Sequence, residues 1–328
     1  MARIVFMGSP EFALPTLRRL LDSEHQVVAV YTQPDRPAGR GRGLRPPPAK
    51  ELALERGMPV FQPPRVSAPE AVAELAALRP DLIVIAAYGQ ILKQPVLDMP
   101  RRGVLNVHAS LLPRHRGASP VAAAILAGDE ETGVSIMRVE LALDAGPVLA
   151  ARRLPIDPWD STGSLAARLA EEGADLLMEV LPTWLEGTLQ AVPQDEAQAT
   201  YAPAIRKEEG RIGWRVHAEE LWRRVRAYNP WPGAFTHLDG QPLRILEAWP
   251  FPSEAFARGE SASGGDVAPG TVVAAPAAAA ALPRRAAFAV QTGHGLLGVI
   301  TVQKAGRRAL PADQFLRGER GLLGKRLG

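Results

Sequence analysis

Residues 104–117 read Val104-Leu105-Asn106-Val107-His108-Ala109-Ser110-Leu111-Leu112-Pro113-Arg114-His115-Arg116-Gly117. The first half is apolar and favours a β-strand, and a polar Asn106 and His108 interrupt it. Because side chains alternate along a strand, Asn106, His108 and Ser110 share one face. An amide, an imidazole and a hydroxyl therefore emerge together where the strand ends. In an open α/β sheet this is the edge that borders the ligand crevice.

Two interpretations of this cluster are open from the residues themselves. A single histidine in an apolar strand is more often a hydrogen-bonded structural group than a catalyst. Two neighbouring features favour chemistry. An irregular loop with Arg114 and Arg116 follows the strand, and a lone Asp144 lies in a turn-like Asp-Ala-Gly after the apolar strand expected at 133–139.

The composition of the chain excludes several classes of function. Its 328 residues suggest two domains, and 46% hydrophobic with 22% charged residues is ordinary for a globular protein. With no cysteine, disulfides, thiolate zinc sites and cysteine nucleophiles are excluded. We see no targeting segment and no membrane span, and expect a cytoplasmic protein without a membrane partner. A net charge of +3 is weak, so any affinity for nucleic acid depends on clustered charges.

The first half alternates strands with helices, which predicts an α/β fold with a doubly wound, mostly parallel sheet. The apolar run at 82–87 indicates a central strand covered on both faces. We expect an edge strand at 148–156 and then a long amphipathic helix at 164–185 that packs back on the sheet. After Gly8 the further glycines of a dinucleotide fingerprint are missing, which disfavours a nicotinamide-dependent oxidoreductase.

The second half predicts a smaller domain. Periodicity fades where Gln, Ala and Pro dominate, and we place a linker at 189–205 between a first domain at 1–188 and a second at 206–328. Five short predicted strands, at 234–238, 243–249, 270–275, 288–291 and 296–303, suggest an OB-like β-barrel, a scaffold that often holds oligonucleotides.

The segment 33–48 is rich in Arg, Gly and Pro. It has two interpretations: a solvated connection, or a loop that follows an RNA backbone with basic residues spaced by glycine. Charge alone leaves both open.

The motif Asn106-x-His108, continued by 110–114 and Arg116-Gly117 and completed by Asp144-x-Gly146, resembles the signature of the 10-formyltetrahydrofolate-dependent formyltransferases. From Ile4-Val5-Phe6-Met7-Gly8 through Tyr228-Asn229-Pro230-Trp231-Pro232, the whole chain is similar to the branch that acts on methionyl-tRNA. His115, Ala142 and Pro147 depart from the residues usual in that family.

The resemblance implies formyl transfer from 10-formyltetrahydrofolate to initiator methionyl-tRNA by a monomer without a metal. It implies three catalytic residues: Asn106, His108 and Asp144. It implies folate contacts from Ser110, Leu111, Leu112, Pro113, Tyr88 and Gly89. In that family the loop at 33–48 inserts against the tRNA acceptor end, which implies tRNA contacts from Arg36, Arg40 and Arg42. We expect two further tRNA contacts after the linker, from Arg206 and Lys207.

Our hypothesis for the chemistry assigns one role to each catalytic residue. Asn106 donates to the formyl oxygen, His108 transfers a proton or hydrogen-bonds the oxyanion, and Asp144 orients His108 and assists the leaving nitrogen. Ser110 is the rival nucleophile, and we assign it to folate binding. Two alternatives stay open: a formyltransferase for an amino-sugar nucleotide, and a noncatalytic RNA-binding protein on the same fold.

Overall fold

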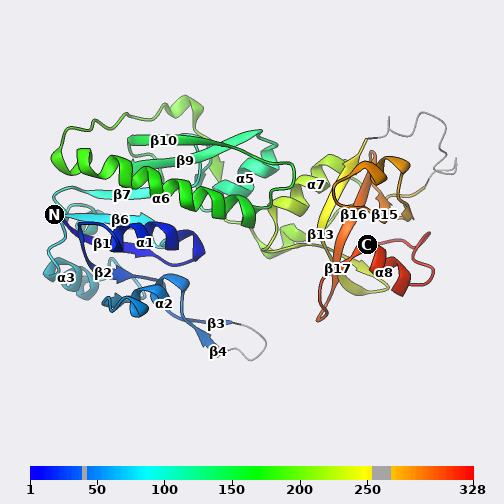
Figure 1. Cartoon of the computed structure of the whole chain (residues 1–328), viewed down its shortest axis with the longest axis horizontal. Coiled ribbons are helices and arrows are strands. Elements are labelled where there is room, and N and C mark those ends of the chain that lie inside the picture. Colours follow the sequence, from blue (N-terminus) through cyan, green and yellow to red (C-terminus); the bar gives the residue numbers. More distant parts are fainter. Residues whose placement is uncertain (39–42, 253–266) are drawn as a thin grey trace. The chain divides into compact units, whose positions relative to one another are not determined.

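The computed structural model describes residues 1–38, 43–252 and 267–328 (Figure 1). They form two compact units, which we describe one at a time. The first comprises Met1–Val121, Glu130–Ile156 and Ser164–Pro203, and the second Ala122–Asp129, Asp157–Gly163 and Ala204–Gly328. Among the described residues, none of the helices combines the length and the hydrophobicity that a membrane span requires.

The first unit is built on a seven-stranded sheet with the strand order β10-β9-β7-β6-β1-β2-β5 (Figure 1). Its strands are β1 (Arg3–Gly8), β2 (Gln26–Tyr31), β5 (Val60–Phe61), β6 (Leu82–Ala86), β7 (Val104–His108), β9 (Glu131–Arg138) and β10 (Val148–Pro155). The five strands from β7 to β5 are parallel, and β9 and β10 are antiparallel additions at one edge. The prediction of a mostly parallel α/β sheet is confirmed, and β10 is the edge strand.

Helices connect these strands and cover the sheet. They are α1 (Leu14–Leu21), α2 (Pro48–Glu55), α3 (Pro69–Ala77), α4 (Gln94–Leu97) and α6 (Thr162–Glu186). Most of α5 (Pro120–Ala127) belongs to the second unit. All five residues of β6 are buried, as its unbroken apolar run predicts. A Cβ on Gly173 of α6 would lie 2.5 Å from Val107 Cγ1, so the helix packs closely on β7, which confirms that it folds back on the sheet.

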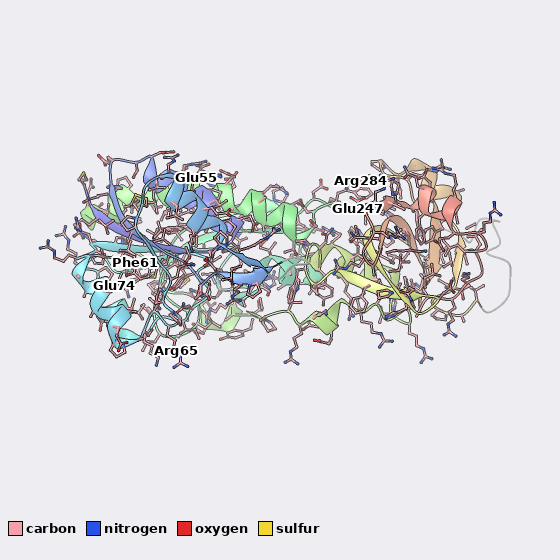
Figure 2. The ribbon with its side chains drawn as sticks, turned by 90° about the horizontal axis from the view of Figure 1, so that it is seen from below. Glu55, Phe61, Arg65, Glu74, Glu247 and Arg284 are labelled. Carbon is pink, nitrogen blue, oxygen red and sulfur yellow. The ribbon has the colours of Figure 1, made fainter. Side chains whose placement is uncertain are left out.

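Aromatic packing closes the edge of this sheet at β5. The rings of Tyr31 and Phe61 stack with their centroids 5.0 Å apart, and the Tyr31 hydroxyl donates to Glu74 at 3.4 Å. Phe61 and Glu74 lie near each other on this edge, with Arg65 on the same part of the molecule (Figure 2).

Two short pairs of strands were not predicted. β3 (Arg36–Ala38) and β4 (Gly43–Arg45) form an antiparallel ribbon where we expected a loop without regular structure. Three-residue strands are too short to show a period in the sequence. β8 (Arg116–Gly117) pairs in parallel with β11 (Tyr201–Ala202), so part of the segment predicted as a linker is fastened to the loop after β7.

The second unit contains a six-stranded antiparallel sheet with the main order β12-β13-β16-β15-β14, and β17 beside β16. Its strands are β12 (Ala234–Leu238), β13 (Gln241–Phe251), β14 (Val272–Ala274), β15 (Phe288–Gln291), β16 (Leu296–Lys304) and β17 (Leu310–Pro311), with helices α7 (Ala218–Ala227) and α8 (Ala312–Gly318). Arg284 and Glu247 form an ion pair on this unit (Figure 2). All five strands predicted here are present, and the sheet forms a smaller barrel-like domain.

Candidate active site

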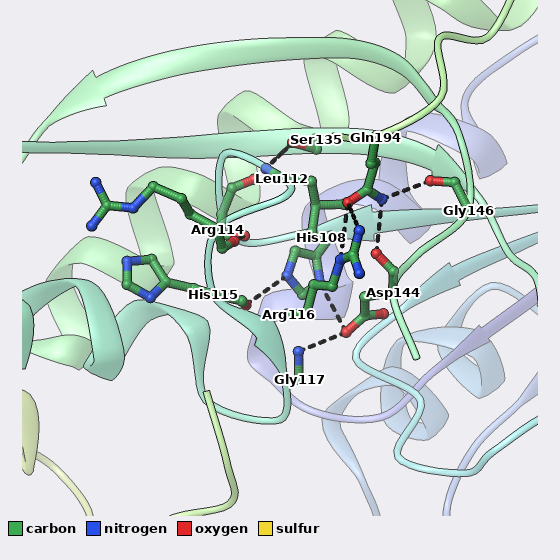
Figure 3. Close-up of polar contacts among 11 residues, drawn as sticks. His108, Leu112, Arg114, His115, Arg116, Gly117, Ser135, Asp144, Gly146 and Gln194 are labelled. Atoms are coloured by element: carbon green, nitrogen blue, oxygen red, sulfur yellow. Dashed lines mark hydrogen bonds and ion pairs between the residues drawn. The ribbon is translucent and has the colours of Figure 1, made fainter. Parts of the chain in front are cut away.

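His108 ends β7, and its imidazole is buried with 5% of the residue exposed. Nε2 lies 3.2 Å from the His115 carbonyl oxygen. Because a carbonyl oxygen only accepts, Nε2 carries the hydrogen in this contact, and in the neutral ring Nδ1 keeps its lone pair. Nδ1 faces Asp144 Oδ2 at 3.7 Å, too far for a direct hydrogen bond (Figure 3). The neutral ring and the carboxylate therefore present two adjacent proton acceptors.

Burial lowers the pKa of His108 below its ordinary value of 6.5. The Asp144 carboxylate and the hydrogen bond to the His115 carbonyl act in the opposite direction and raise it, but burial is the larger effect. At neutral pH the imidazole is therefore uncharged, which is the form that accepts a proton.

Asp144 lies in the turn between β9 and β10 and has a left-handed backbone, with φ of +47°. Its Oδ2 accepts a hydrogen bond from the Gly117 backbone N–H at 2.8 Å (Figure 3). The same oxygen is the one that faces His108. The loop after β7 thus orients the carboxylate toward the ring, and Gly117 acts through its backbone alone.

Asn106 lies two residues before His108 on the same face of β7 and is half-buried. In the described part of the chain, its side-chain amide forms no hydrogen bond to another protein group. The hydrogens of this amide are therefore available to a carbonyl oxygen of a substrate.

The hydroxyl of Ser110 is used inside the loop. Ser110 is fully buried, and its Oγ donates to the Arg114 carbonyl at 2.6 Å. Its own carbonyl accepts from Ser135 Oγ at 2.8 Å, and Ser135 Oγ accepts from the Leu112 N–H at 3.1 Å. This pattern fixes the loop at 110–114 against β9 and disfavours Ser110 as a nucleophile, because its single proton is committed to a carbonyl.

A cavity of about 510 Å³ opens over the carboxyl ends of β1, β2 and β6. Its lining comprises Ser9, Pro10, Glu11, Gln33, Pro34, Arg36, Arg45, Pro46, Pro47, Pro48, Ala87, Tyr88 and Gly89. The structure thus brings together Tyr88 and Gly89, predicted to bind folate, with Arg36, predicted to bind tRNA. Ser110, Leu111, Leu112 and Pro113 lie instead in the loop after β7, the strand next to β6.

The other predicted tRNA contacts lie elsewhere. Arg206 and Lys207 are exposed at the start of the second unit. Arg36 is exposed, and its Nη2 donates to Gln33 Oε1 at 3.1 Å. Arg40 and Arg42 lie outside the described residues. As for metals, the residues described include no group of three or more His, Asp or Glu side chains placed to hold an ion.

Sequence reasoning missed a set of polar residues around the turn that holds Asp144. Arg116, only 1% exposed, donates to Gln194 Oε1 and to both oxygens of Glu196. Gln194 in turn donates to the carbonyls of Asp144 and Gly146 (Figure 3). No local pattern around Gln194 could have revealed this contact.

Comparison with known proteins identifies the class. Residues 2–181 match the formyl transferase family, and residues 204–320 match the C-terminal domain of formyl transferases. The chain belongs to the formyl transferase family, which confirms the resemblance seen in the sequence.

The comparison with one relative, matched over nearly its full length, gives a more specific result. The chain is 50% identical to the methionyl-tRNA formyltransferase of Methylococcus capsulatus, over 99% of both chains. Among solved structures, it superposes with a TM-score of 0.61 at 21% identity on HypX from Aquifex aeolicus in complex with tetrahydrofolic acid, covering 99% of this chain and 48% of HypX, about half its length. WlaRD, a sugar 3N-formyl transferase, gives a TM-score of 0.63 at 16% identity, covering 94% of this chain and 99% of WlaRD.

Proposed function

We propose that the chain transfers the formyl group of 10-formyltetrahydrofolate to the free amino group of methionyl-initiator-tRNA, giving N-formylmethionyl-tRNA for translation initiation. The observation that carries the proposal is the pairing of His108 with Asp144, on a strand face that also presents Asn106, whose amide has no hydrogen-bond partner among the described protein groups. The chain that holds these residues matches a methionyl-tRNA formyltransferase over its full length. Formyl transfer is an acyl transfer: an amine attacks, a tetrahedral oxyanion forms, and the folate nitrogen leaves.

The amine attacks in its uncharged form, and its nitrogen must lose one proton as it bonds to the formyl carbon, because the product is a neutral amide. His108 Nδ1 and Asp144 Oδ2 supply two acceptors 3.7 Å apart on one side of the site. A proton taken up on Nδ1 creates an imidazolium that the adjacent carboxylate stabilises. The burial that keeps His108 neutral before the reaction thus prepares it to act as the base.

The tetrahedral intermediate concentrates negative charge on the formyl oxygen. The side-chain amide of Asn106 is the candidate donor, because it emerges on the same face of β7 as His108 and has no hydrogen-bond partner among the described protein groups. One such donor contributes on the order of 10²- to 10³-fold in rate. When the intermediate collapses, the proton held by His108 and Asp144 moves to N10 of the leaving tetrahydrofolate.

The proposal also assigns residues to each of the two substrates. We assign the folate to the loop at 110–113 and to Tyr88 and Gly89, at the ends of the neighbouring strands β7 and β6. We assign the tRNA to the basic residues Arg36, Arg40, Arg42, Arg206 and Lys207. The proposal includes a catalytic domain at 1–188, a linker at 189–205 and an OB-like tRNA-binding domain at 206–328. It also includes that the protein acts as a monomer in the cytoplasm.

An amino-sugar nucleotide is the second candidate acceptor. The likeness to WlaRD covers nearly the whole of both chains, but at 16% identity it supports the fold alone. The 50% identity to a methionyl-tRNA formyltransferase and the exposed arginines Arg36 and Arg45 on the β3–β4 ribbon favour tRNA.

The test is formyl transfer from 10-formyltetrahydrofolate to initiator methionyl-tRNA, measured for the native chain and for Asn106→Ala. We expect turnover by the native chain and a decrease on the order of 10²-fold or more in kcat for the variant. An inactive native chain that still binds RNA would instead support the noncatalytic alternative, and an active Asn106→Ala would remove Asn106 from the mechanism.

A further inference from the structure

We infer that Gln194 is a positioning residue for Asp144: from the segment after α6, its amide fixes the backbone of the turn that presents this carboxylate to His108. The inference rests on the proposed function, because it concerns how the proposed catalytic pair is held. Gln194 does not contact the reacting atoms in this account. It acts through the 144–146 backbone.

The amide of Gln194 has every hydrogen-bonding position filled. Nε2 donates to the Asp144 carbonyl at 2.8 Å and to the Gly146 carbonyl at 2.7 Å. Oε1 accepts from Arg116 Nε at 3.0 Å and from Arg116 Nη2 at 2.8 Å. The opposite orientation of the amide would set its oxygen against two carbonyls and its hydrogens against a guanidinium, so only one orientation is possible.

Arg116 anchors this amide to the signature loop. Its guanidinium is almost fully buried, and it also forms two hydrogen bonds with Glu196 at 2.9 and 2.8 Å. A buried guanidinium is stable only when its donors are satisfied, and its planar fork suits two acceptors side by side. The backbone reinforces the attachment, because β8, which contains Arg116, pairs with β11 a few residues after Glu196.

The turn that Gln194 holds is one that needs support. Asp144 has a left-handed φ of +47°, an uncommon conformation for a residue with a side chain. A Cβ on Gly146 would lie 1.9 Å from the Arg138 carbonyl oxygen, so the turn lies directly against β9. Gln194 binds the carbonyls of Asp144 and Gly146, the two residues that these constraints affect.

Asp144 is therefore held at two points, by two segments of the chain. Gly117 binds its carboxylate through a backbone N–H, and Gln194 binds its carbonyl. Arg116, which precedes Gly117 in the chain, donates to Gln194 and so links these two contacts. If Gln194 is replaced, the turn is free to shift, and a displacement of about 1 Å between catalytic groups can cost on the order of 10²-fold in rate.

The experiment compares Gln194→Met, which keeps the length of the side chain without its hydrogen bonds, with Gln198→Met as the matched control. Gln198 lies in the same segment and is exposed, and among the described residues its side chain bonds to nearby Asp195 alone. For Gln194→Met we expect kcat for methionyl-tRNA to fall about 10- to 100-fold. The KM values for 10-formyltetrahydrofolate and tRNA should stay within about twofold of the native values, because the variant does not remove a contact that binds either substrate. Gln198→Met should match the native chain.

A double-mutant cycle separates positioning from a general effect on folding. In an Asp144→Ala background, Gln194→Met should lower kcat by less than about threefold, because the group it positions is already gone. An equal loss in both backgrounds, or native kcat in Gln194→Met alone, would overturn the inference.

If Gln194→Met does not fold, Arg116→Lys replaces it in the same cycle, since a lysine keeps the charge but lacks the fork. A native chain that transfers no formyl group would overturn the proposed function, an outcome distinct from an active native chain with an unaffected Gln194→Met.

Discussion

At the residue scale, the behaviour of His108 follows from two opposed effects on its pKa. Burial removes water from the ring and disfavours its charged form, while the Asp144 carboxylate favours it, and burial is the larger effect. The neutral ring with a lone pair on Nδ1 is the form that the proposed mechanism uses. The part of the pH dependence that comes from the enzyme should therefore follow protonation of this ring.

This gives a pH dependence with a defined sign. As the pH falls, kcat/KM, referred to the fraction of methionyl-tRNA whose amine is uncharged, should stay level through neutrality and decline with a midpoint below the ordinary histidine pKa of 6.5. In Asp144→Asn the remaining activity should decline at still lower pH, because the carboxylate that raises the pKa of His108 is gone. The measurement is kcat/KM between about pH 5 and pH 8. A midpoint above 7, or one that rises in Asp144→Asn, would contradict the assignment.

At the scale of elements, the turn between β9 and β10 depends on a residue without a side chain. Gly146→Ala would place a Cβ 1.9 Å from the Arg138 carbonyl oxygen. Neither backbone can move without disturbing the pairing of Arg138 in β9, so we expect a loss of about 1 to 3 kcal/mol in the free energy of unfolding.

Urea denaturation tests this expectation. Gly213→Ala is the control, because the position has open space around it and an ordinary φ. We expect the control to change stability by less than about 0.5 kcal/mol. Equal stability of the two variants would show that the turn tolerates a side chain.

The β3–β4 ribbon places two exposed arginines opposite each other, since Arg36 pairs with Arg45. If they bind tRNA phosphates, Arg36→Gln with Arg45→Gln should raise the KM for methionyl-tRNA. The dependence of this KM on salt should also become weaker, with a slope about one unit smaller for each phosphate that is no longer neutralised. Arg65→Gln, an exposed arginine on the β5 edge, serves as the control (Figure 2). The KM for 10-formyltetrahydrofolate should not change.

A rise of the KM for 10-formyltetrahydrofolate in the ribbon variant would show instead that these arginines contribute to folate binding through the cavity that they line. An unchanged slope against salt would remove both arginines from the tRNA interface.

At the scale of the whole molecule, most of the longer helices and strands could be predicted because their signals are local. The run of β6 and the polar interruptions at Asn106 and His108 are contained in a few residues each. Gln194 could not be predicted, because it lies 50 residues after Asp144 in a segment without periodicity. Its role depends on the pairing of β8 with β11, which forms only in the folded chain.

The basic residues belong to the same scale. The chain carries a net charge of only +3, so a uniform field would attract RNA weakly. Exposed basic residues occur in both units: Arg36 in the first, and Arg206 and Lys207 in the second. The proposed tRNA contacts therefore involve both units. The identity of the acceptor is therefore the part of the proposed function that an experiment tests most directly.

The most direct measurement gives the native chain initiator methionyl-tRNA and an amino-sugar nucleotide at equal concentrations, with 10-formyltetrahydrofolate as the donor, and follows the formyl group into each product. We predict that the formyl group appears on methionyl-tRNA alone, and that His108→Ala abolishes its appearance. Formylation of the sugar nucleotide in preference to the tRNA would contradict the account, because it would keep the chemistry of Asn106, His108 and Asp144 but remove the acceptor that we propose.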